Sequence, residues 1–267
     1  MKTSVIISSC DLYSDCWAPM IHSFRLHWPD CPFPIYFISN FSELDEPGIT
    51  FIKVGEHKGF GSNMKKALEL IGSDNVILFL EDFFLDKKIE TEMIFNHIQH
   101  CKDENIDFLK IDSRDIIYRD DLRIGDSFYC SNPLDIKYSL NASIAIWKKE
   151  ALLLLSVEGF SAWDFERKGL SYIRENQIKI KSETILSTSF NSKTIKKISA
   201  PGAVCKGMWT NEGVEFLTKY NYIELISTRE IEGKFIRFLI SLYRPNSLSW
   251  IPIGLLLRLL QKFKINL

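Results

Sequence analysis

Two adjacent carboxylates stand at the end of a strongly apolar segment. Residues 75–80 (NVILFL) are typical of a buried strand, and Glu81 and Asp82 follow directly. In an open α/β sheet, ligands bind beyond the carboxyl ends of the strands. Carboxylates there could hold a divalent cation, which would bind the oxygens of a diphosphate. The pair is therefore a candidate diphosphate site, with two solvated acids at a strand end as the alternative.

A second pair of acids lies in the segment WDFE. Asp164 and Glu166 stand near the start of a helix predicted over 163–176. Either acid could be a general base, which must reach an acceptor hydroxyl within hydrogen-bond distance, and Trp163 offers an aromatic face for a sugar. The alternative is a pair of acids that interact favourably with the helix dipole, beside a core tryptophan.

A loop bounded by glycines carries a single lysine. In residues 202–209 (GAVCKGMW), the glycines would let the backbone approach a phosphate, and Lys206 would act as a point charge. The segment lacks the spacing of a Walker P-loop. A plain turn is the alternative.

The elements that must position these residues alternate along the chain. Strands are predicted at 3–9, 34–39, 49–54, 75–80, 107–111, 139–147 and 178–185, and helices at 17–28, 64–71, 89–101, 148–157 and 163–176. This order indicates right-handed βαβ units and a mostly parallel sheet flanked by helices. Ser62 or Asn63 is expected to cap the helix at 64–71. The alternation in 178–185 predicts a strand with one exposed face.

Composition narrows the class of protein. The chain has 267 residues and a formal net charge of −1, so it offers no whole-chain attraction to nucleic acid. Its six cysteines form no CxxC pair and are expected to be reduced and mostly buried. We expect no signal peptide and no membrane-spanning stretch, since no apolar run reaches about 20 residues. A cytoplasmic location is the resulting expectation.

The composition changes at residue 233. Residues 233–267 contain six basic residues and no acid, interleaved with aliphatic and aromatic residues. Two short helices, separated by Pro245 and Pro252, would form a basic amphipathic tail typical of a membrane interface. An ordinary helix packed on the domain is the alternative. We therefore expect a domain at 1–232 and a membrane-attaching tail at 233–267.

Several motifs together resemble a known family of enzymes. They are Cys10–Trp17 (CDLYSDCW), Trp28–Asp30 (WPD), Pro34–Tyr36 (PIY), Val76–Phe83 (VILFLEDF), Ser139–Trp147 (SLNASIAIW) and Trp163–Glu166 (WDFE). In order and spacing, residues 1–215 resemble a bacterial glycosyltransferase with a GT-A-type, Rossmann-like fold, of the family-2-like group that builds surface polysaccharides.

This resemblance implies a nucleotide-sugar donor bound against the first half of the sheet. Asp11 would lie near the base or ribose, and Tyr13, Lys65 and Lys206 would also belong to the donor side. The Glu81–Asp82 pair would stand where the family's Asp-x-Asp motif binds Mn²⁺ or Mg²⁺.

The resemblance also implies an acceptor side. Asn141 and Trp163 would line it, and Asp164 or Glu166, with Asp164 preferred, would deprotonate an acceptor hydroxyl in an inverting single displacement. The acceptor would be a glycan or a lipid-linked glycan, in lipopolysaccharide O-antigen or core or capsule synthesis, at the inner face of the cytoplasmic membrane.

Departures from the family pattern leave alternatives open. Phe83 stands where many relatives carry a third acid, and Lys206 stands in place of a histidine that often completes the metal site. Lys206 could replace part of the cation's charge, which would make the enzyme metal-independent. A nucleotidyltransferase is the nearest rival, but the loop Ser8–Tyr13 has neither glycine nor basic residue. A non-catalytic, membrane-bound scaffold of a polysaccharide assembly complex is the other alternative.

Overall fold

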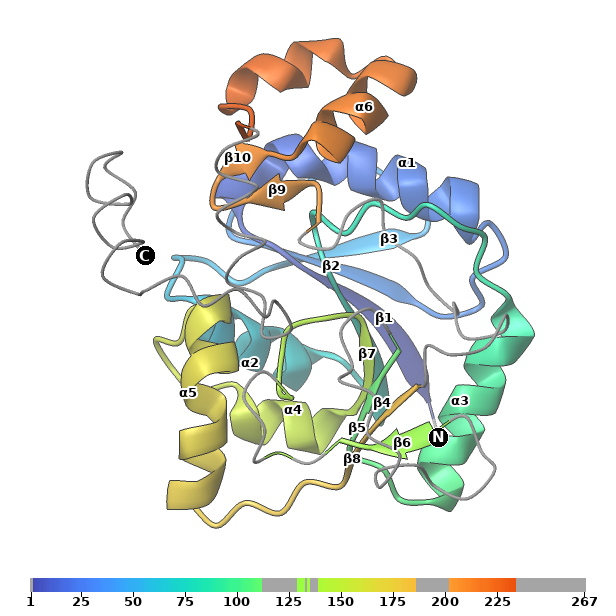
Figure 1. Ribbon diagram of the computed structural model, residues 1–267, viewed down its shortest axis with the longest axis vertical. Coiled ribbons are helices and arrows are strands. Elements are labelled where there is room, and N and C mark those ends of the chain that lie inside the picture. Colours follow the sequence, from blue (N-terminus) through green and yellow to red (C-terminus); the bar gives the residue numbers. More distant parts are fainter. Residues whose placement is uncertain (1, 112–128, 133, 135–138, 186–201, 234–267) are drawn as a thin grey trace, which may run out of the picture.

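A computed structural model describes residues 2–111, 129–132, 134, 139–185 and 202–233 of the 267-residue chain (Figure 1). Its centre is an eight-stranded sheet with the order β3-β2-β1-β4-β7-β5-β8-β6. The strands are β1 (Thr3–Ser8), β2 (Ile35–Ser39), β3 (Ile49–Lys53), β4 (Asn75–Leu80), β5 (Phe108–Lys110), β6 (Tyr129–Ser131), β7 (Ala145–Lys148) and β8 (Ser182–Ile185). The predicted α/β class with a central sheet between helices is confirmed.

The sheet has a parallel half and a mixed half. Strands β1 to β4 are parallel neighbours, and β5 and β8 also pair in parallel. Strand β7 lies antiparallel between β4 and β5, and β6 is antiparallel to β8. The carboxyl ends of β1 and β4 therefore meet at one edge, where strand-end ligand sites are expected.

Helices cover both faces of the sheet, as alternation along the strands requires. The helical elements are η1 (Asp11–Cys16), α1 (Trp17–His27), α2 (Phe60–Leu70), α3 (Thr91–Asp103), α4 (Lys149–Leu155), α5 (Ala162–Glu175), α6 (Asn211–Lys219) and η3 (Ile223–Thr228). On β1, Val5 and Ile7 face the cluster that includes α1, α3 and α6, whereas Ile6 faces the one that includes α2, α4 and α5. Three layers result (Figure 1).

A small hairpin lies outside the main sheet. It consists of β9 (Val204–Cys205) and β10 (Met208–Trp209), which pair antiparallel. In Figure 1 this hairpin lies beside the beginning of α1, in the part of the molecule toward which β1 runs. The hairpin and α6 thus bring a late part of the chain to the edge where β1 and β4 end.

Two sequence predictions about local structure are wrong. The helix predicted from Met64 begins at Phe60, because Gly59 adopts a φ of 92° and turns the chain into the helix earlier. Ser62 and Asn63 are therefore inside the helix rather than at its cap. The other error concerns β8, whose four residues are all buried: Glu183 bonds to His100 of α3 at 2.7 Å, and Ile185 lies in the apolar cluster.

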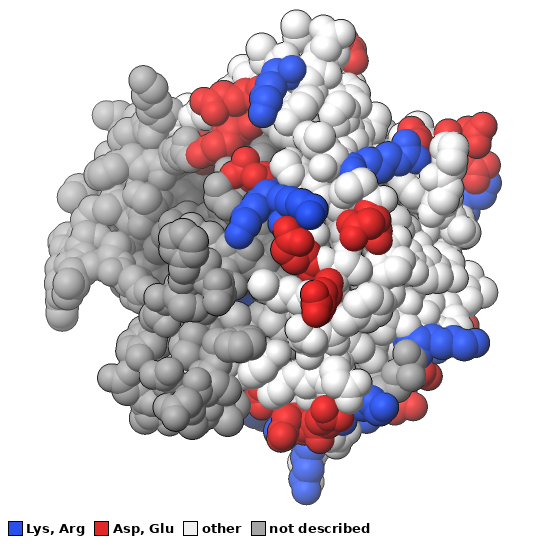
Figure 2. All heavy atoms as spheres, turned by 90° about the vertical axis from the view of Figure 1, so that its right-hand side faces the viewer, with Lys and Arg blue, Asp and Glu red and all other residues white. Residues whose placement is uncertain are grey.

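The cysteines and the surface agree with the composition. All six cysteines are free, and five of them are buried. On the face of the molecule shown in Figure 2, basic and acidic side chains are interspersed. In the described part of the chain, the helices are all too short or too polar to cross a bilayer. The predicted amphipathic tail, from residue 234 onward, lies outside the described residues.

Candidate active site

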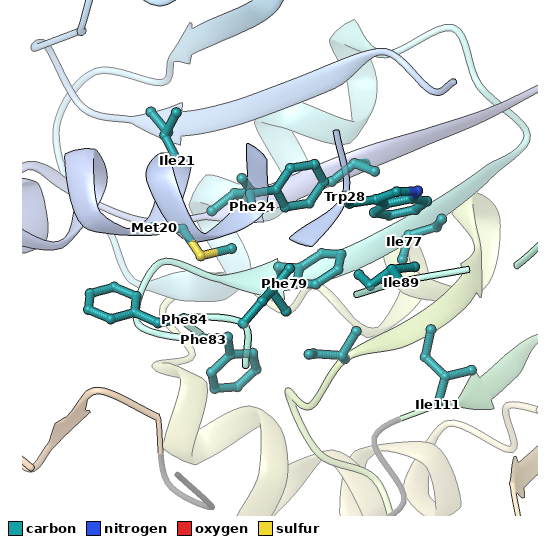
Figure 3. Packing of buried hydrophobic residues seen from close by; sticks show 14 of the residues in the cluster. Met20, Ile21, Phe24, Trp28, Ile77, Phe79, Phe83, Phe84, Ile89 and Ile111 are labelled. Atoms are coloured by element: carbon teal, nitrogen blue, oxygen red, sulfur yellow. The ribbon is translucent and has the colours of Figure 1, made fainter. Parts of the chain in front are cut away.

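The Glu81–Asp82 pair lies at the junction of β4 and β1. The Glu81 backbone N–H donates to the Ser8 carbonyl at 3.2 Å, which extends the β1–β4 ladder by one residue. Phe83 and Phe84, which follow directly, are 4% and 0% exposed. Figure 3 shows both rings in the apolar cluster with Met20 of α1. The acids are thus held at the strand end by buried residues on either side.

The environment of Glu81 opposes its ionisation. Burial, and then the adjacent Asp82 carboxylate, raise the pKa of Glu81 well above its usual value. Its own backbone N–H and the Arg229 guanidinium act in the opposite direction without reversing the shift. An ionisable carboxyl placed beside a second acid, with its pKa strongly raised, destabilises the folded chain. Arrangements of this kind are concentrated at functional sites, where the chemistry requires them.

Asp82 is buried against the segment that leads into the β9–β10 hairpin. Its backbone carbonyl accepts the Ala203 N–H at 2.7 Å, and its Oδ2 accepts the Val204 N–H at 3.4 Å. A Cβ on Gly202 would lie 2.2 Å from Asp82 Oδ2, and Gly202 has a φ of 106°. Both the close approach and the left-handed backbone require glycine at this position. The glycine-bounded loop therefore packs on the predicted acid site.

The turn of this hairpin consists of Lys206 and Gly207. Their φ angles of 51° and 80° are those of a two-residue hairpin turn with both residues left-handed, and Lys206 is exposed. This geometry is that of a plain turn, the alternative to a phosphate-binding loop for residues 202–209. A contact of Lys206 with a donor phosphate stays a prediction.

Arg229 pairs with Asp15 in the turn after β1, a contact that the sequence did not predict. Arg229 donates from Nε to Asp15 Oδ2 and from Nη2 to Asp15 Oδ1, both at 2.7 Å. Its guanidinium carbon lies 4.3 Å from the centre of the Tyr13 ring and 5.7 Å from that of Trp209. Arg229 stands 214 residues from Asp15 in the sequence, and no motif surrounds it.

The groups around this ion pair share its electrostatics. Burial raises the pKa of Asp15, but the hydrogen bonds from Arg229 and Thr228 outweigh that effect, so the pKa is lowered overall. Burial and the charge of Glu81 raise the pKa of Tyr13, and the same two causes raise the pKa of Cys10. The phenol and the thiol therefore stay protonated at neutral pH, whereas Asp15 and Arg229 are held in their charged forms.

Asp11 joins the ends of neighbouring strands. Its Oδ1 accepts the Asn40 N–H at 2.7 Å, and its Oδ2 accepts the N–H groups of Phe41 and Ser42, each at 3.1 Å. Burial raises the pKa of Asp11, but these donors and the Ser42 hydroxyl lower it overall. The carboxylate thus fixes the loop after β2 against the loop after β1. A place near a donor base or ribose stays a prediction for Asp11.

Asp164 is engaged at the start of α5. Ser161 is the N-cap residue, and its side chain and backbone form a capping box with Asp164. Lys168, one turn later, lies 2.8 Å from the Asp164 carboxylate. The hydrogen bonds from Lys168, and then those from Ser161, lower the pKa of Asp164 to about 2. A carboxylate this acidic is a weak base at neutral pH.

Glu166 faces the predicted acceptor side instead. Its Oε1 accepts the Ala142 N–H at 2.9 Å, directly after Asn141, whose Oδ1 accepts from Ser143. Trp163 is 59% exposed, which excludes the alternative of a core tryptophan. The structure therefore brings Glu166 and the loop of Asn141 together.

The remaining predicted residues concern the donor side and the metal. Lys65 is exposed on α2 and precedes Lys66, whose Nζ donates to the Val54 carbonyl at 2.8 Å. Among the described residues, no group of three or more His, Cys, Asp or Glu is arranged to hold a metal ion. Glu81 and Asp82 alone would supply two carboxylates. Such a pair fits Mg²⁺, which usually keeps several waters and binds through one or two carboxylates plus substrate phosphates.

Comparisons with known proteins give the following. No family model and no curated protein match the chain. Among solved structures, it is similar to S. aureus TarS 1–349 in complex with UDP-GlcNAc (TM-score 0.47, 16% identity, 71% of this chain and 57% of that chain). It is also similar to a cytidylyltransferase from Leptospira borgpetersenii (0.47, 12%, 93% and 99%) and to a putative nucleotide-diphospho-sugar transferase from Desulfovibrio desulfuricans (0.41, 8%, 87% and 100%). The chain spans little more than half of the TarS chain. At TM-scores below 0.5 these likenesses assign no function to this chain.

Proposed function

We propose that this chain is a glycosyltransferase that moves a sugar from a nucleotide-sugar donor to a hydroxyl of a glycan or lipid-linked acceptor. The observation that carries the proposal is the Glu81–Asp82 pair at the carboxyl end of β4. One acid has a strongly raised pKa, and the other is buried against a glycine that leaves room for no side chain. Two adjacent carboxyl groups at a strand end could together hold a divalent cation, and that cation would supply the positive charge that a leaving diphosphate demands.

In this proposal the donor diphosphate binds at the Glu81–Asp82 pair, on the β1–β4 side of the sheet. A Mn²⁺ or Mg²⁺ ion held by Glu81 and Asp82 would neutralise the diphosphate. Tyr13, Asp11, Lys65 and Lys206 belong to the donor side as well. The sequence motifs that resemble GT-A-type enzymes support this assignment.

For the acceptor side we propose Glu166, rather than Asp164, as the base of an inverting transfer. Asp164 is committed to Ser161 and Lys168, and its pKa of about 2 makes it a weak base. Glu166 contacts the Asn141–Ala142 backbone, which the motif resemblance assigns to the acceptor. The exposed Trp163 would supply the stacking face for the acceptor sugar.

The test is release of a nucleoside diphosphate from a panel of nucleotide sugars, with Mg²⁺, Mn²⁺ or EDTA and candidate glycan acceptors. Asp82→Asn should remove the release, whereas Asp45→Asn, at an exposed acid of the loop before β3, should leave it intact. Release that needs an acceptor supports transfer over hydrolysis. The proposal is overturned if the folded wild-type chain releases no diphosphate from any donor.

A nucleotidyltransferase is the second enzymatic candidate, and the loop after β1 weighs against it. This loop is the 3-10 turn η1, and residues 8–13 contain no glycine or basic residue that could wrap a nucleoside triphosphate. A parallel assay that supplies nucleoside triphosphates and sugar phosphates decides between the two activities. A nucleotidyltransferase would release pyrophosphate from a nucleoside triphosphate and a sugar phosphate. A non-catalytic scaffold would release neither product.

We further propose that the enzyme acts at the inner face of the cytoplasmic membrane, in lipopolysaccharide or capsule synthesis. The support is the composition of residues 233–267, with six basic residues, no acid and a high apolar content. A chain truncated after Glu232 should no longer sediment with vesicles that contain anionic lipid. Sedimentation equal to that of the full chain would contradict the membrane role of the tail.

A further inference from the structure

Arg229 connects three parts of the chain that are distant in sequence. Besides its two bonds to Asp15, Nη2 donates to the Leu12 carbonyl at 3.1 Å and Nη1 to the Gly207 carbonyl at 3.4 Å. Asp15 and Leu12 belong to η1, the turn that follows β1, and Gly207 belongs to the hairpin turn. A single guanidinium thus holds the turn after β1 against the β9–β10 hairpin.

The hairpin in turn holds Asp82. The segment that enters β9 donates the Ala203 N–H to the Asp82 carbonyl at 2.7 Å. On the other strand, the Trp209 N–H donates to the Glu230 carbonyl at 2.8 Å, next to Arg229 itself. The contacts therefore form a path from Arg229 through the hairpin to Asp82, and Arg229 also ties this path to η1.

The pair of Arg229 and Asp15 has the features of a fixed unit. Only 11% of the Arg229 side chain and 13% of the Asp15 side chain are exposed, and the two hydrogen bonds are parallel and short. Bidentate pairs of this kind add geometric specificity that a lysine cannot reproduce. The Tyr13 ring stacks against the guanidinium, so the orientation of Tyr13 depends on Arg229 as well.

We infer that Arg229, held by two hydrogen bonds to Asp15, is a positioning residue. It orients Asp82 and Tyr13 toward the diphosphate part of a bound nucleotide. The inference rests on the proposed function, because it states that binding of the donor's diphosphate depends on the Arg229–Asp15 pair. Arg229 is not a catalytic residue in this account, since its hydrogen bonds go to Asp15, Leu12 and Gly207. Its effect on the ligand is transmitted by the hairpin and by η1.

A positioning role and a merely structural role differ in what they do to nucleotide affinity. Loss of a structural tie lowers the melting temperature and weakens all nucleotides alike through partial unfolding. Loss of positioning at Asp82 and Tyr13 removes the contribution of the outer phosphate. The ratio of the affinities for a nucleoside diphosphate and the matching monophosphate separates the two roles. UDP and UMP are one such pair, and guanosine or cytidine nucleotides replace them if the wild type binds those more tightly.

The test compares Arg229→Gln, Arg229→Lys and Asp15→Asn in the full chain by calorimetry well below the melting temperature. Arg25→Gln is the matched control, because Arg25 also pairs with a carboxylate (Glu46, 2.8 Å) and a carbonyl (Pro47, 2.9 Å), but on α1 away from the acids. We expect the diphosphate-to-monophosphate affinity ratio to fall at least 10-fold in Arg229→Gln and Asp15→Asn. It should fall in Arg229→Lys too and stay within twofold in Arg25→Gln.

Amide hydrogen exchange gives a readout that needs no ligand. Exchange at Ala203 and Val204, whose N–H groups bond to Asp82, should become at least 10-fold faster in Arg229→Lys than in the wild type. An unchanged affinity ratio in folded Arg229 variants would overturn the inference, and so would unchanged exchange at these amides. If the wild type binds no nucleotide, the proposed function fails by itself, and the exchange experiment still decides whether Arg229 positions Asp82.

Discussion

Two pairs of acids in this chain have the same composition and opposite environments. Glu81 and Asp82 end a buried strand, and burial together with their mutual repulsion raises the pKa of Glu81. Asp164 begins an exposed helix turn, where Lys168 and Ser161 lower its pKa to about 2. An ionisable Glu81 opposes folding at neutral pH, whereas Asp164 contributes to folding through a capping box. Acids that destabilise the fold are the better candidates for function.

The largest expected effect comes from substitutions in the Glu81–Asp82 pair. Asp82→Asn or Glu81→Gln should lower sugar transfer by about 100- to 1000-fold, because each removes a proposed ligand of the cation that would stabilise the leaving diphosphate. Glu81→Gln should at the same time raise the melting temperature at pH 7 by about 2–4 °C, since an amide has no ionisation to suppress. Activity assays and thermal melts measure the two effects, and a Glu81→Gln chain that is both active and less stable would remove the distinction between the pairs.

The pH dependence of the Glu81 effect follows from linkage. Because the folded state binds the Glu81 proton more tightly than the unfolded state, this group lowers stability as pH rises from about 4.5 through the raised pKa. The stability difference between Glu81→Gln and the wild type should therefore grow with pH over that range. Denaturant melts at several pH values measure it. A constant difference would mean that Glu81 ionises normally.

Substitutions of Asp164 and Glu166 are expected to have very different effects on turnover. Glu166→Gln should lower turnover by about 100-fold or more, the usual contribution of a general base. Asp164→Asn should change turnover by less than about twofold, because its carboxylate serves Ser161 and Lys168. Turnover at saturating donor measures both, with circular dichroism as the control for folding. The reverse order of effects would restore Asp164 as the base.

A substitution at Gly202 tests how closely this residue packs against Asp82. Gly202→Ala should destabilise the chain by about 2–3 kcal/mol, because its Cβ would meet Asp82 and its φ of 106° disfavours a side chain. Gly207→Ala is a useful comparison: it also has a positive φ, but nothing lies within 4 Å of the added Cβ. Denaturant melts of both variants separate backbone strain from the clash with Asp82. Equal losses would show that the contact with Asp82 contributes nothing.

The smallest effect is expected from the helix start. Asp164 has a lowered pKa, so its stabilisation is present above pH 3.8 and is lost as pH falls toward about 2. Asp164→Asn should lower the melting temperature by no more than about 2–3 °C at neutral pH and flatten the acid side of the stability profile. Melts between pH 2 and 7 test this. A profile that keeps its slope would assign the acid sensitivity to other groups.

The sequence predicted the elements that are built from local patterns. The apolar runs located β1 and β4, and the strand-end position of Glu81 followed from the run before it. The start of α2 was missed because Ser62 and Asn63 are candidate caps by residue type, whereas Gly59 is the residue that precedes the helix. The burial of β8 was missed because its partner β6 follows a charged segment that shows no strand pattern.

The missing part of the candidate site has a different cause. Arg229 meets Asp15 through tertiary packing, and neither periodicity nor a motif marks such a pair in one sequence. The commitment of Asp164 to a capping box was readable in principle, since Ser161 stands three residues before it. The sequence thus located the acids, and the structure distinguished the ones engaged in capping from the ones held against repulsion.

The separation of Asp15 and Arg229 also has a consequence for biosynthesis. Contacts between residues 214 positions apart form late, because a long loop must close before they contribute. As the chain leaves the ribosome, β1, η1 and β4 emerge long before Arg229, the guanidinium partner of Asp15. The strand order can therefore assemble early, while the acid-bearing edge stays open. The tie between η1 and the β9–β10 hairpin can form only once residue 229 has been made, so it cannot guide the earlier pairing of β1 with β4.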